Sequence, residues 1–383
     1  MKKVGIITIH KSTNYGACLQ AHALWKFITL QGYNGFIIDL YRNIHEGFIP
    51  SKKYTIYEKP YIDQTQKSRL EVIKKPLRKI YNRIQNQIYS EARQKRKKRF
   101  DAFNAMSVYS EPYPCIDQLY ETPPQYDIYI TGSDQVWNPT IGIPLEPYFL
   151  TFTNSPNKIS YASSFGVSAL DDKYKILFQP WLSTYKMISV REKEGADLVK
   201  QIIDKQVPVC LDPTLLIGAD YWKSIASQTE IKDPYILLFF IKGVTKQVLT
   251  YCTSIAKSKG YKLIILGETS LTCYMKYHTI ADAGPREFIS LIKNAKMVFT
   301  DSFHGFAFSI MLNDNFYILL DKAINGKSRN SRINTLLDAL HLHDRILNFN
   351  NLKDFPSINR NKLNTSLKEM QENSAQYLIN NLK

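Results

Sequence analysis

The sequence has little of what would place it in a specialised class of protein. Its cysteines are few, odd in number and far apart, so no pair has the spacing of a metal site or of a disulfide framework. The five are Cys18, Cys115, Cys210, Cys252 and Cys273. Scattered cysteines of this kind are typical of a reducing cytoplasm.

Long apolar runs are also missing. Residues 235–241 form one of the longest, far short of the roughly 20 residues that a membrane span requires. The apolar run at residues 4–9 follows two lysines but is too short for the core of a signal peptide. The sequence therefore indicates a globular protein rather than a membrane-spanning one.

Acidic residues are outnumbered by basic ones. The 383 residues include 50 Lys and Arg against 34 Asp and Glu, a net charge of +16. Residues 67–99 concentrate this excess, with 13 basic residues and two glutamates, a net charge of +11. An excess of one sign favours partners of the opposite sign, so we expect an anionic partner.

The basic segment has a helical pattern over residues 70–103, with an interruption expected at Pro76. An apolar stripe runs between its basic residues: Leu77, Ile80, Tyr81, Ile84 and Ile88. One interpretation is a solvated helix that packs on its domain through this stripe. The other is a dock for an anionic membrane surface or a polyanionic substrate. Nucleic acid is not expected, because no recognised binding motif accompanies the basic residues.

Strand and helix patterns alternate along the chain, which predicts an α/β fold with parallel sheets. Strands are expected at residues 4–9, 36–40, 126–130, 158–163, 187–190, 208–211, 235–241, 261–266, 297–299 and 316–320. Helices are expected at residues 17–30, 245–259, 306–312, 333–340 and 363–383, with a further one beginning near Gly284. We predict two domains, residues 1–230 with a basic helical insertion at about 64–105, and residues 231–383. The first strand–helix–strand unit lacks a G-x-G-x-x-G motif, so a dinucleotide is not proposed there.

The stretch from residue 297 to 312 is the centre of the predicted site. A short strand runs into the turn Thr300-Asp301-Ser302-Phe303-His304-Gly305, and an apolar helix follows at once. In an open parallel sheet, ligands bind beyond the carboxyl ends of the strands, and a helix that begins there favours an anion. Two structural alternatives stay open: Asp301 or Ser302 as the N-cap of the helix, and His304 as a satisfied buried histidine.

Several other strands end in small polar turns, which suggests that the turns share one crevice. The turns that supply candidate residues lie at 10–16, 131–138, 191–195 and 325–332. Their candidate substrate-binding residues, together with Ser302, are Asn14, Tyr15, Gly16, Gly132, Ser133, Arg191, Lys327 and Arg332. Asp134 and Asp301 are candidate general bases. His304 is the candidate acid or phosphate partner, because histidine is the residue type best suited to exchange a proton near neutral pH.

The ordered set of these motifs resembles the polysaccharide pyruvyl transferase family, from residue 4 to about 345. The motifs that carry the likeness are Gly5 to Thr8, Asn14 to Ala17, Tyr126 to Asn138, Ser160 to Gly166, Ser189 to Glu192, Leu211 to Thr214 and Thr300 to Gly305. The resemblance implies two Rossmann-like domains arranged as in GT-B glycosyltransferases, with the site between them. It also implies phosphoenolpyruvate as the donor substrate. No cofactor is expected besides this donor, and no metal, because the sequence shows no cluster of metal ligands. The acceptor would be a sugar diol of a bacterial surface polysaccharide or its lipid-linked precursor, and the product a cyclic pyruvate ketal.

The resemblance places His304 in the phosphoenolpyruvate site. Several branches of the family have an arginine two positions before this histidine, where the present chain has Ser302. The donor's positive partner must then lie elsewhere, and the candidates are Arg191, Arg332 and Lys327, in that order. Such an enzyme would be cytoplasmic, and peripheral to the inner membrane face if the basic segment docks there.

Two other functions remain open at this point. One is a GT-B glycosyltransferase that uses a nucleotide sugar, which shares the expected fold. The other is a non-enzymatic protein that binds a polyanion or a membrane, which only the basic segment favours.

Overall fold

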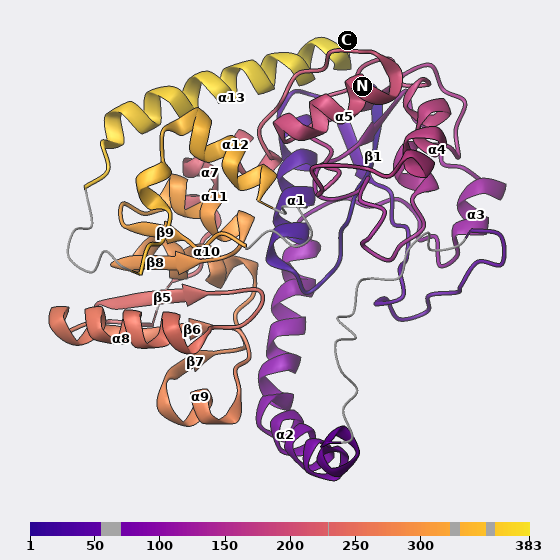
Figure 1. Cartoon of the computed structure of the whole chain (residues 1–383). Coiled ribbons are helices and arrows are strands. Elements are labelled where there is room, and N and C mark those ends of the chain that lie inside the picture. Colours follow the sequence, from indigo (N-terminus) through magenta and orange to yellow (C-terminus); the bar gives the residue numbers. More distant parts are fainter. Residues whose placement is uncertain (55–69, 229, 322–329, 350–356) are drawn as a thin grey trace.

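Two parallel β-sheets flanked by helices form the framework of the chain (Figure 1). The computed structural model describes residues 1–54, 70–228, 230–321, 330–349 and 357–383, and over 70–78 only the course of the helix. The strand orders are β2-β1-β3-β4 in the first sheet and β7-β6-β5-β8-β9 in the second. All strand pairs are parallel, so the carboxyl ends of the strands meet at one edge of each sheet. The predicted α/β fold with two Rossmann-like units is confirmed.

The first unit holds the four-stranded sheet. Its central strands are buried apolar runs, as expected where helices cover both faces of a parallel sheet. The strands are β1 (Lys3–Ile7), β2 (Asn34–Ile37), β3 (Ile128–Thr131) and β4 (Lys158–Ser160). The helices are α1 (Tyr15–Leu30), α2 (Leu70–Asn104), α3 (Ile116–Glu121), the 3₁₀ turn η1 (Glu146–Phe149), α4 (Asp172–Leu182), α5 (Lys193–Ile203), α6 (Pro213–Leu216) and α7 (Ala219–Ile225).

The second unit holds the five-stranded sheet, with β5 and β8 at its centre. The strands are β5 (Tyr235–Phe239), β6 (Lys262–Leu266), β7 (His278–Ile280), β8 (Met297–Thr300) and β9 (Phe316–Ile318). The helices are α8 (Lys246–Lys259), α9 (Leu271–Lys276), α10 (Pro285–Asn294), α11 (Phe303–Leu312), α12 (Ser331–Leu340), the 3₁₀ turn η2 (His343–Arg345) and α13 (Arg360–Leu382).

The strands predicted at residues 187–190 and 208–211 are wrong: both segments make only isolated bridges at the edge beyond β4. Serine side chains replace part of the expected ladder. Ser160 Oγ donates to the carbonyl of Ser189 at 2.9 Å, and Ser189 Oγ donates to the carbonyl of Ser160 at 3.1 Å. Side chains that bond neighbouring backbone in this way compete with regular pairing.

Helix α1 joins the two units, because it packs on both of them. Leu24 and Ile28 lie in the core beside β1, whereas Tyr15 and Leu19 lie in the core of the second unit. The Tyr15 ring stacks on Phe288 at 4.5 Å, and its hydroxyl donates to the carbonyl of Ala283 at 2.8 Å. The N-terminal end of α1 is therefore fixed at the boundary between the units.

Helix α2 runs along the second unit, although its sequence lies within the first (Figure 1). It continues without a break through Pro76, contrary to the interruption predicted there. Phe100 and Phe103 anchor its end in the core shared with the second unit. Ile80, Ile84 and Ile88 of the predicted stripe are instead 57%, 44% and 37% exposed, so the stripe does not pack on the domain through its isoleucines. Tyr81 of the stripe does contact the second unit at Leu271, and the side chain of Leu77 lies outside the described residues.

Helix α13 returns from the second unit to the first and covers both (Figure 1). Leu363 and Leu367 pack in the core of the second unit, and Leu378 and Leu382 pack beside β1. Two Rossmann-like units that face one another, with a returning C-terminal helix, form the GT-B arrangement. Throughout the described ranges, the helices are too short or too polar to cross a bilayer.

Candidate functional site

A cleft of about 1470 Å³ lies between the two units, at the carboxyl ends of the central strands. It exceeds the usual upper volume of about 1,000 Å³ for a small-molecule site, so two substrates fit at once. Residues from the first unit that line it include Lys11, Asn14, Tyr15, Gly16, Arg96, Tyr109 and Asp134. Residues from the second unit include Phe239, Asp301, Ser302, Phe303, His304 and Arg332.

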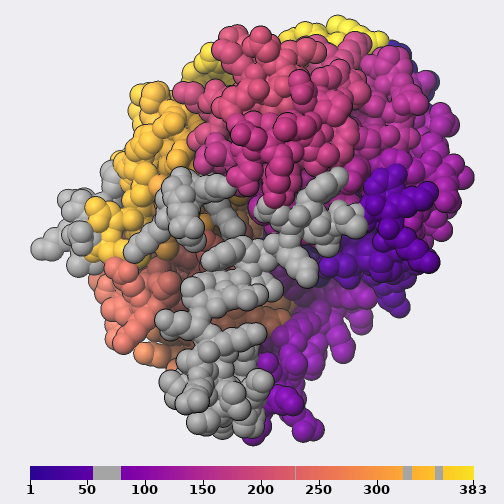
Figure 2. All heavy atoms as spheres, turned by 45° about the vertical axis from the view of Figure 1, so that its right-hand side comes forward, coloured from indigo at the N-terminus to yellow at the C-terminus, as the bar shows by residue number. Residues whose placement is uncertain are grey.

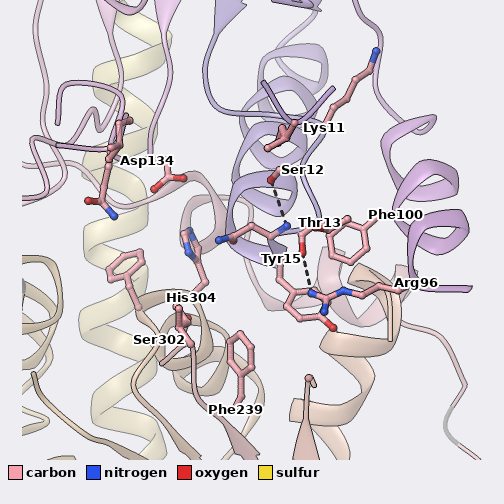
Figure 3. Close-up of a pocket in the computed structure, with 18 of the residues that line it drawn as sticks. Lys11, Ser12, Thr13, Tyr15, Arg96, Phe100, Asp134, Phe239, Ser302 and His304 are labelled. Carbon is pink, nitrogen blue, oxygen red and sulfur yellow. Dashed lines mark hydrogen bonds between the residues drawn. The ribbon is translucent and has the colours of Figure 1, made fainter. Parts of the chain in front are cut away.

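The N-terminal ends of α1 and α11 meet at the floor of the cleft (Figure 3). Asn14 caps α1 by accepting from the N–H of Ala17, and Ser302 caps α11 by accepting from the N–H of Gly305. A Cβ on Gly16 would lie 2.0 Å from Nδ1 of His304, so only glycine allows this approach. Both helix ends favour negative charge, so the floor of the cleft is suited to an anion.

Asp212 is the centre of a buried ion cluster behind this floor. Its Oδ2 accepts from Arg191 Nη1 at 2.5 Å and from Ser133 Oγ at 3.0 Å, and its Oδ1 accepts from the N–H of Thr214 at 3.0 Å. His304 Nε2 is 3.6 Å from Oδ2, which is an electrostatic contact longer than a hydrogen bond. Burial alone would raise the pKa of Asp212, but His304 and Arg191 hold that pKa well below its usual value. Asp212 is therefore ionised and faces His304 as a fixed negative charge.

Arg191 lies beneath the cleft rather than on its surface, with its side chain only 1% exposed. Its Nη2 is 3.5 Å from Asp134 Oδ1, and neither Nη2 nor Nε has a hydrogen-bond partner in the described part of the chain. Burial would lower the pKa of Arg191, but Asp212 and Asp134 raise it above its usual value. Arg191 thus forms ion pairs with two carboxylates. It is not among the residues that line the cleft, so its position does not favour direct contact with a ligand.

Arg332 does line the cleft, from the first turn of α12. Its guanidinium lies 5.6 Å from the centre of the Phe303 ring, and that of Arg191 lies 4.6 Å from the same centre. Among the residues that the structure describes, Arg332 forms no hydrogen bond or ion pair with the protein. Burial and the nearby charge of Arg191 lower the pKa of Arg332 to about 10. A cation kept without a partner at this depth is suited to bind an anionic ligand.

Asp301 has a structural task, since its oxygens accept the backbone N–H groups of Ile241 at 2.7 Å and Lys242 at 3.3 Å. Burial raises the pKa of Asp301 above its usual value. Asp134 lies on the opposite wall with a left-handed backbone, φ 72°, and its side chain is 15% exposed. Of these two carboxylates, Asp134 is the one whose oxygens accept no backbone N–H group from the described residues.

The remaining predicted residues are distributed as follows. Gly132 packs on β1, where an added Cβ would lie 2.9 Å from Cβ of Thr8, and Ser133 is buried behind the cleft against Asp212. Lys327 lies outside the described residues. The structure thus brings together His304, Asp134, Arg332 and the two helix ends, with Arg191 and Ser133 as the layer beneath them.

Sequence reasoning missed Asp212 as the centre of the cluster. The Asp-Pro pair at 212–213 signals an N-cap, and Asp212 does cap α6. Its contacts with Arg191 and His304 depend on segments that are far apart in the sequence, so no local pattern could have revealed them.

Further cations that the sequence did not single out line the cleft, among them Lys11 and Arg96 at its far end (Figure 3). Lys11 has a left-handed backbone, φ 44°, pairs with Asp39 at 2.5 Å and lies 4.1 Å from the Tyr109 ring centre. Arg96 of α2 donates to the carbonyl of Thr13 at 2.9 Å and lies 4.9 Å from the Tyr15 ring centre. Arg96 belongs to the basic run, but the run itself does not indicate which residue turns into the cleft.

In the described ranges, no three His, Cys, Asp or Glu side chains come together as metal ligands would. The fold and site define a two-domain α/β protein with a cleft between its units that is lined by cations and by two helix N-termini.

The profile of the family described as polysaccharide pyruvyl transferase matches residues 14–319. The chain therefore belongs to the polysaccharide pyruvyl transferase family, as its motifs suggested. No curated protein matches the sequence.

Solved structures with a similar course of the chain include sugar-nucleotide enzymes. The UDP-GlcNAc 2-epimerase of Methanocaldococcus jannaschii, in complex with UDP-GlcNAc and UDP, is 13% identical, with a TM-score of 0.49 and coverage of 100% of this chain and 99% of that chain. The epimerase of Neisseria meningitidis bound to UDP-GlcNAc is 10% identical, with the same TM-score and coverage. UGT89C1 of Arabidopsis thaliana, complexed with quercetin, is 11% identical, with a TM-score of 0.44 and coverage of 99% and 93%.

Proposed function

We propose that the protein transfers the pyruvyl group of phosphoenolpyruvate to two hydroxyls of one sugar, forming a cyclic ketal and releasing phosphate. Membership of the family supports a transferase that acts in polysaccharide synthesis. Phosphoenolpyruvate carries a carboxylate and a phosphate, so its site must concentrate positive charge. The observation that carries the proposal is that the cleft is lined by His304, at the N-terminal end of α11, and by Arg332, which has no hydrogen-bond or ion-pair partner among the described residues.

Arg332 and the N-terminal end of α11 bind the anionic groups of the donor in this proposal. The guanidinium of Arg332 can meet a carboxylate or a phosphate with two parallel hydrogen bonds. The sequence had placed Arg191 first among the candidate anchors. Its burial and its ion pair with Asp212 now favour Arg332 for direct contact with the donor.

His304 acts as the general acid. It gives a proton to the methylene carbon of the donor, which leaves positive charge on carbon two. The first sugar hydroxyl bonds to that carbon and loses its proton to a base. The bond from carbon two to the phosphate oxygen then breaks, phosphate leaves with the electron pair, and the second hydroxyl closes the ketal. The second hydroxyl's proton returns to His304, and the base passes the first one to phosphate.

Asp134 is the favoured base. Its carboxylate opens to the cleft, whereas the oxygens of Asp301 already accept backbone N–H groups. A base must reach the hydroxyl within hydrogen-bond distance. Asp301 is less suitable, because its oxygens already accept the N–H groups of Ile241 and Lys242.

Arg191 and Asp212 are positioning residues. Ionised Asp212 faces the His304 imidazole across 3.6 Å and orients it, and Arg191 fixes both Asp212 and Asp134. Charges oriented before the reaction require no rearrangement as charge develops on the donor.

The acceptor is proposed to be a sugar of a bacterial surface polysaccharide or its lipid-linked precursor, modified by a cytoplasmic enzyme at the inner membrane face. The cleft extends from His304 to Lys11 and Arg96, which leaves room for a sugar beside the donor. Aromatic side chains line this end, among them Tyr109 and Phe100, and such rings suit the apolar face of a sugar.

Thermal shift with candidate donors tests the proposal against a nucleotide-sugar glycosyltransferase. Phosphoenolpyruvate should raise the melting temperature of the wild type by several degrees at saturating concentration, because it binds only the folded state. Arg332→Gln should lose most of this shift, whereas Lys223→Gln, at an exposed site on α7, should retain it. A shift with UDP-GlcNAc or UDP-glucose and none with phosphoenolpyruvate would favour the glycosyltransferase.

A further inference from the structure

Three isoleucines form an exposed stripe on α2. Ile80, Ile84 and Ile88 follow one another at intervals of four residues, which places them along one face of the helix. They are 57%, 44% and 37% exposed. Large apolar residues gathered on one exposed face usually mark a contact surface.

Helix α9 extends this apolar surface from the second unit. The rings of Tyr89 and Tyr274 are 5.4 Å apart, and the Tyr81 hydroxyl accepts the N–H of Leu271 at 3.3 Å. Met275, on the same short helix, is 80% exposed. The two helices lie at the same end of the molecule (Figure 1), and the part of α2 that projects from the body is visible at the lower end of the space-filling view (Figure 2).

Exposed basic residues surround the stripe. Lys79 and Arg83 lie beside the isoleucines, Lys98 lies further along the same face, and Lys276 follows Met275. In the part of the chain that the structure describes, none of these four forms an ion pair. By contrast, Arg93 pairs with Glu268 at 2.6 Å and Arg99 with Asp282 at 3.0 Å, and both pairs hold α2 to the second unit.

We propose that this surface of α2 and α9 docks on an anionic lipid bilayer. The isoleucines and Met275 enter the boundary between head groups and acyl chains, and the basic residues contact the anionic head groups. A second copy of the chain is a poor occupant, because it has the same net charge of +16 and the same basic face. A free polyanion would use the basic residues but would leave the isoleucines exposed to water.

Helix α2 contributes residues both to the docking surface and to the lining of the cleft. Arg96, Lys97 and Phe100 of α2 line the cleft, and Ile88 precedes Phe100 by twelve residues, a rise of about 18 Å. If the proposed function holds, a sugar carried on a membrane lipid can extend from the bilayer into the cleft. The docking itself does not depend on that function.

Co-sedimentation with vesicles tests the proposal. The protein is mixed with vesicles of phosphatidylcholine, with or without phosphatidylglycerol, in low and high salt. We expect strong binding only to the anionic vesicles, with a fraction that survives high salt. The triple variant Lys79→Gln, Arg83→Gln, Lys98→Gln should weaken binding by up to about a hundredfold, since each basic residue contributes roughly fivefold. The triple variant Ile80→Ser, Ile84→Ser, Ile88→Ser should lose the salt-resistant fraction.

Two matched controls carry the same changes at exposed sites elsewhere. Lys186→Gln, Lys205→Gln, Lys232→Gln removes three charges, and Leu30→Ser, Ile176→Ser, Met187→Ser removes three apolar side chains. Both controls should bind as the wild type does.

Equal sedimentation with neutral and anionic vesicles, or test variants indistinguishable from their controls, would overturn the proposal. A lipid-free dimer that the isoleucine variant abolishes would assign the surface to a second copy instead. Vesicle binding without turnover of phosphoenolpyruvate would leave the docking intact and refute only the proposed function.

Discussion

The layer beneath the cleft and helix α2 both carry arginines, but in opposite surroundings. Arg191 is buried, and its ion-pair partner Asp212 is also held by a hydrogen bond from Ser133. Arg93 of α2 makes an equally short pair with Glu268, yet its side chain is 42% exposed. Water and salt weaken the second pair but hardly reach the first.

This difference separates two uses of positive charge. On the floor, each charge acts through one or two neighbours, so a single substitution should have a large effect. On α2, many charges act together on a broad partner, so single substitutions should have small effects and combinations larger ones. The predictions below test this contrast, from the largest expected effect to the smallest.

Removal of the His304 imidazole should have the largest effect on catalysis. His304→Ala should lower the rate of pyruvyl transfer by about a thousandfold, because it removes the proposed general acid, which lies 3.6 Å from Asp212. Phosphate release measures the rate, and circular dichroism checks the fold. His343→Ala, at an exposed histidine on η2, is the control and should remain active. Turnover by His304→Ala close to that of the wild type would remove His304 from the mechanism.

Loss of the buried arginine should have the largest effect on stability. Arg191→Met leaves Asp212 buried without its main cation, which should lower the free energy of unfolding by about 3–5 kcal/mol. Arg93→Met breaks the exposed pair with Glu268 and should cost less than about 1 kcal/mol. Urea unfolding compares the two variants. Equal losses would show that burial does not distinguish the two arginines.

Arg332 should control donor affinity. Arg332→Gln should raise the KM for phosphoenolpyruvate by about 10- to 100-fold, with a smaller change in the acceptor's KM, since it removes one charged hydrogen-bonding partner. The pKa of Arg332 is lowered to about 10. The wild type should therefore lose donor affinity as the pH rises through about 10, and the variant should lack this alkaline decline. Initial rates at several pH values measure both effects, and a parallel decline in the two proteins would contradict the assignment.

His22 provides a buried group that is kept neutral rather than charged. Burial lowers its pKa from 6.5 to about 3, and its ring bonds to Ser107 and Tyr221. Between those pKa values the unfolded chain binds a proton that the folded chain does not, so stability falls as the pH drops below 6.5. The slope is at most about 1.4 kcal/mol per pH unit for this group. In urea unfolding from pH 7 to pH 5, His22→Gln should show a shallower decline, and an unchanged slope would contradict this reading.

Much of the fold could be predicted from the sequence, because buried parallel strands and amphipathic helices leave local patterns. Strand β8, the polar turn after it and the buried helix α11 lie where the pattern placed them. The segments at 187–190 and 208–211 look equally apolar, but serine side chains and a proline without an N–H reduce their pairing to isolated bridges. The pattern of α2 correctly indicated a helix, but it could not show which face packs, since the partner lies in the second unit.

The candidate site was predictable only in part, for a similar reason. Turns at strand ends identified His304, Asp134 and Arg332, all of which line the cleft. The sequence does not show how deeply a side chain is buried. Arg191 therefore seemed a better anchor for the donor than Arg332, although its side chain lies beneath the floor of the cleft. Asp212 is buried at the meeting point of three distant segments, and such a contact has no signature in any one of them.

Mass spectrometry of the acceptor tests the central claim most directly. Purified protein would be incubated with phosphoenolpyruvate labelled with ¹³C at carbon two and with a panel of free and lipid-linked sugars. The account predicts that one sugar gains the mass of labelled pyruvate less one water, with an equal amount of phosphate released, and that His304→Ala yields neither. A sugar that gains a hexose from UDP-glucose, while phosphoenolpyruvate remains unused with every acceptor, would contradict the account.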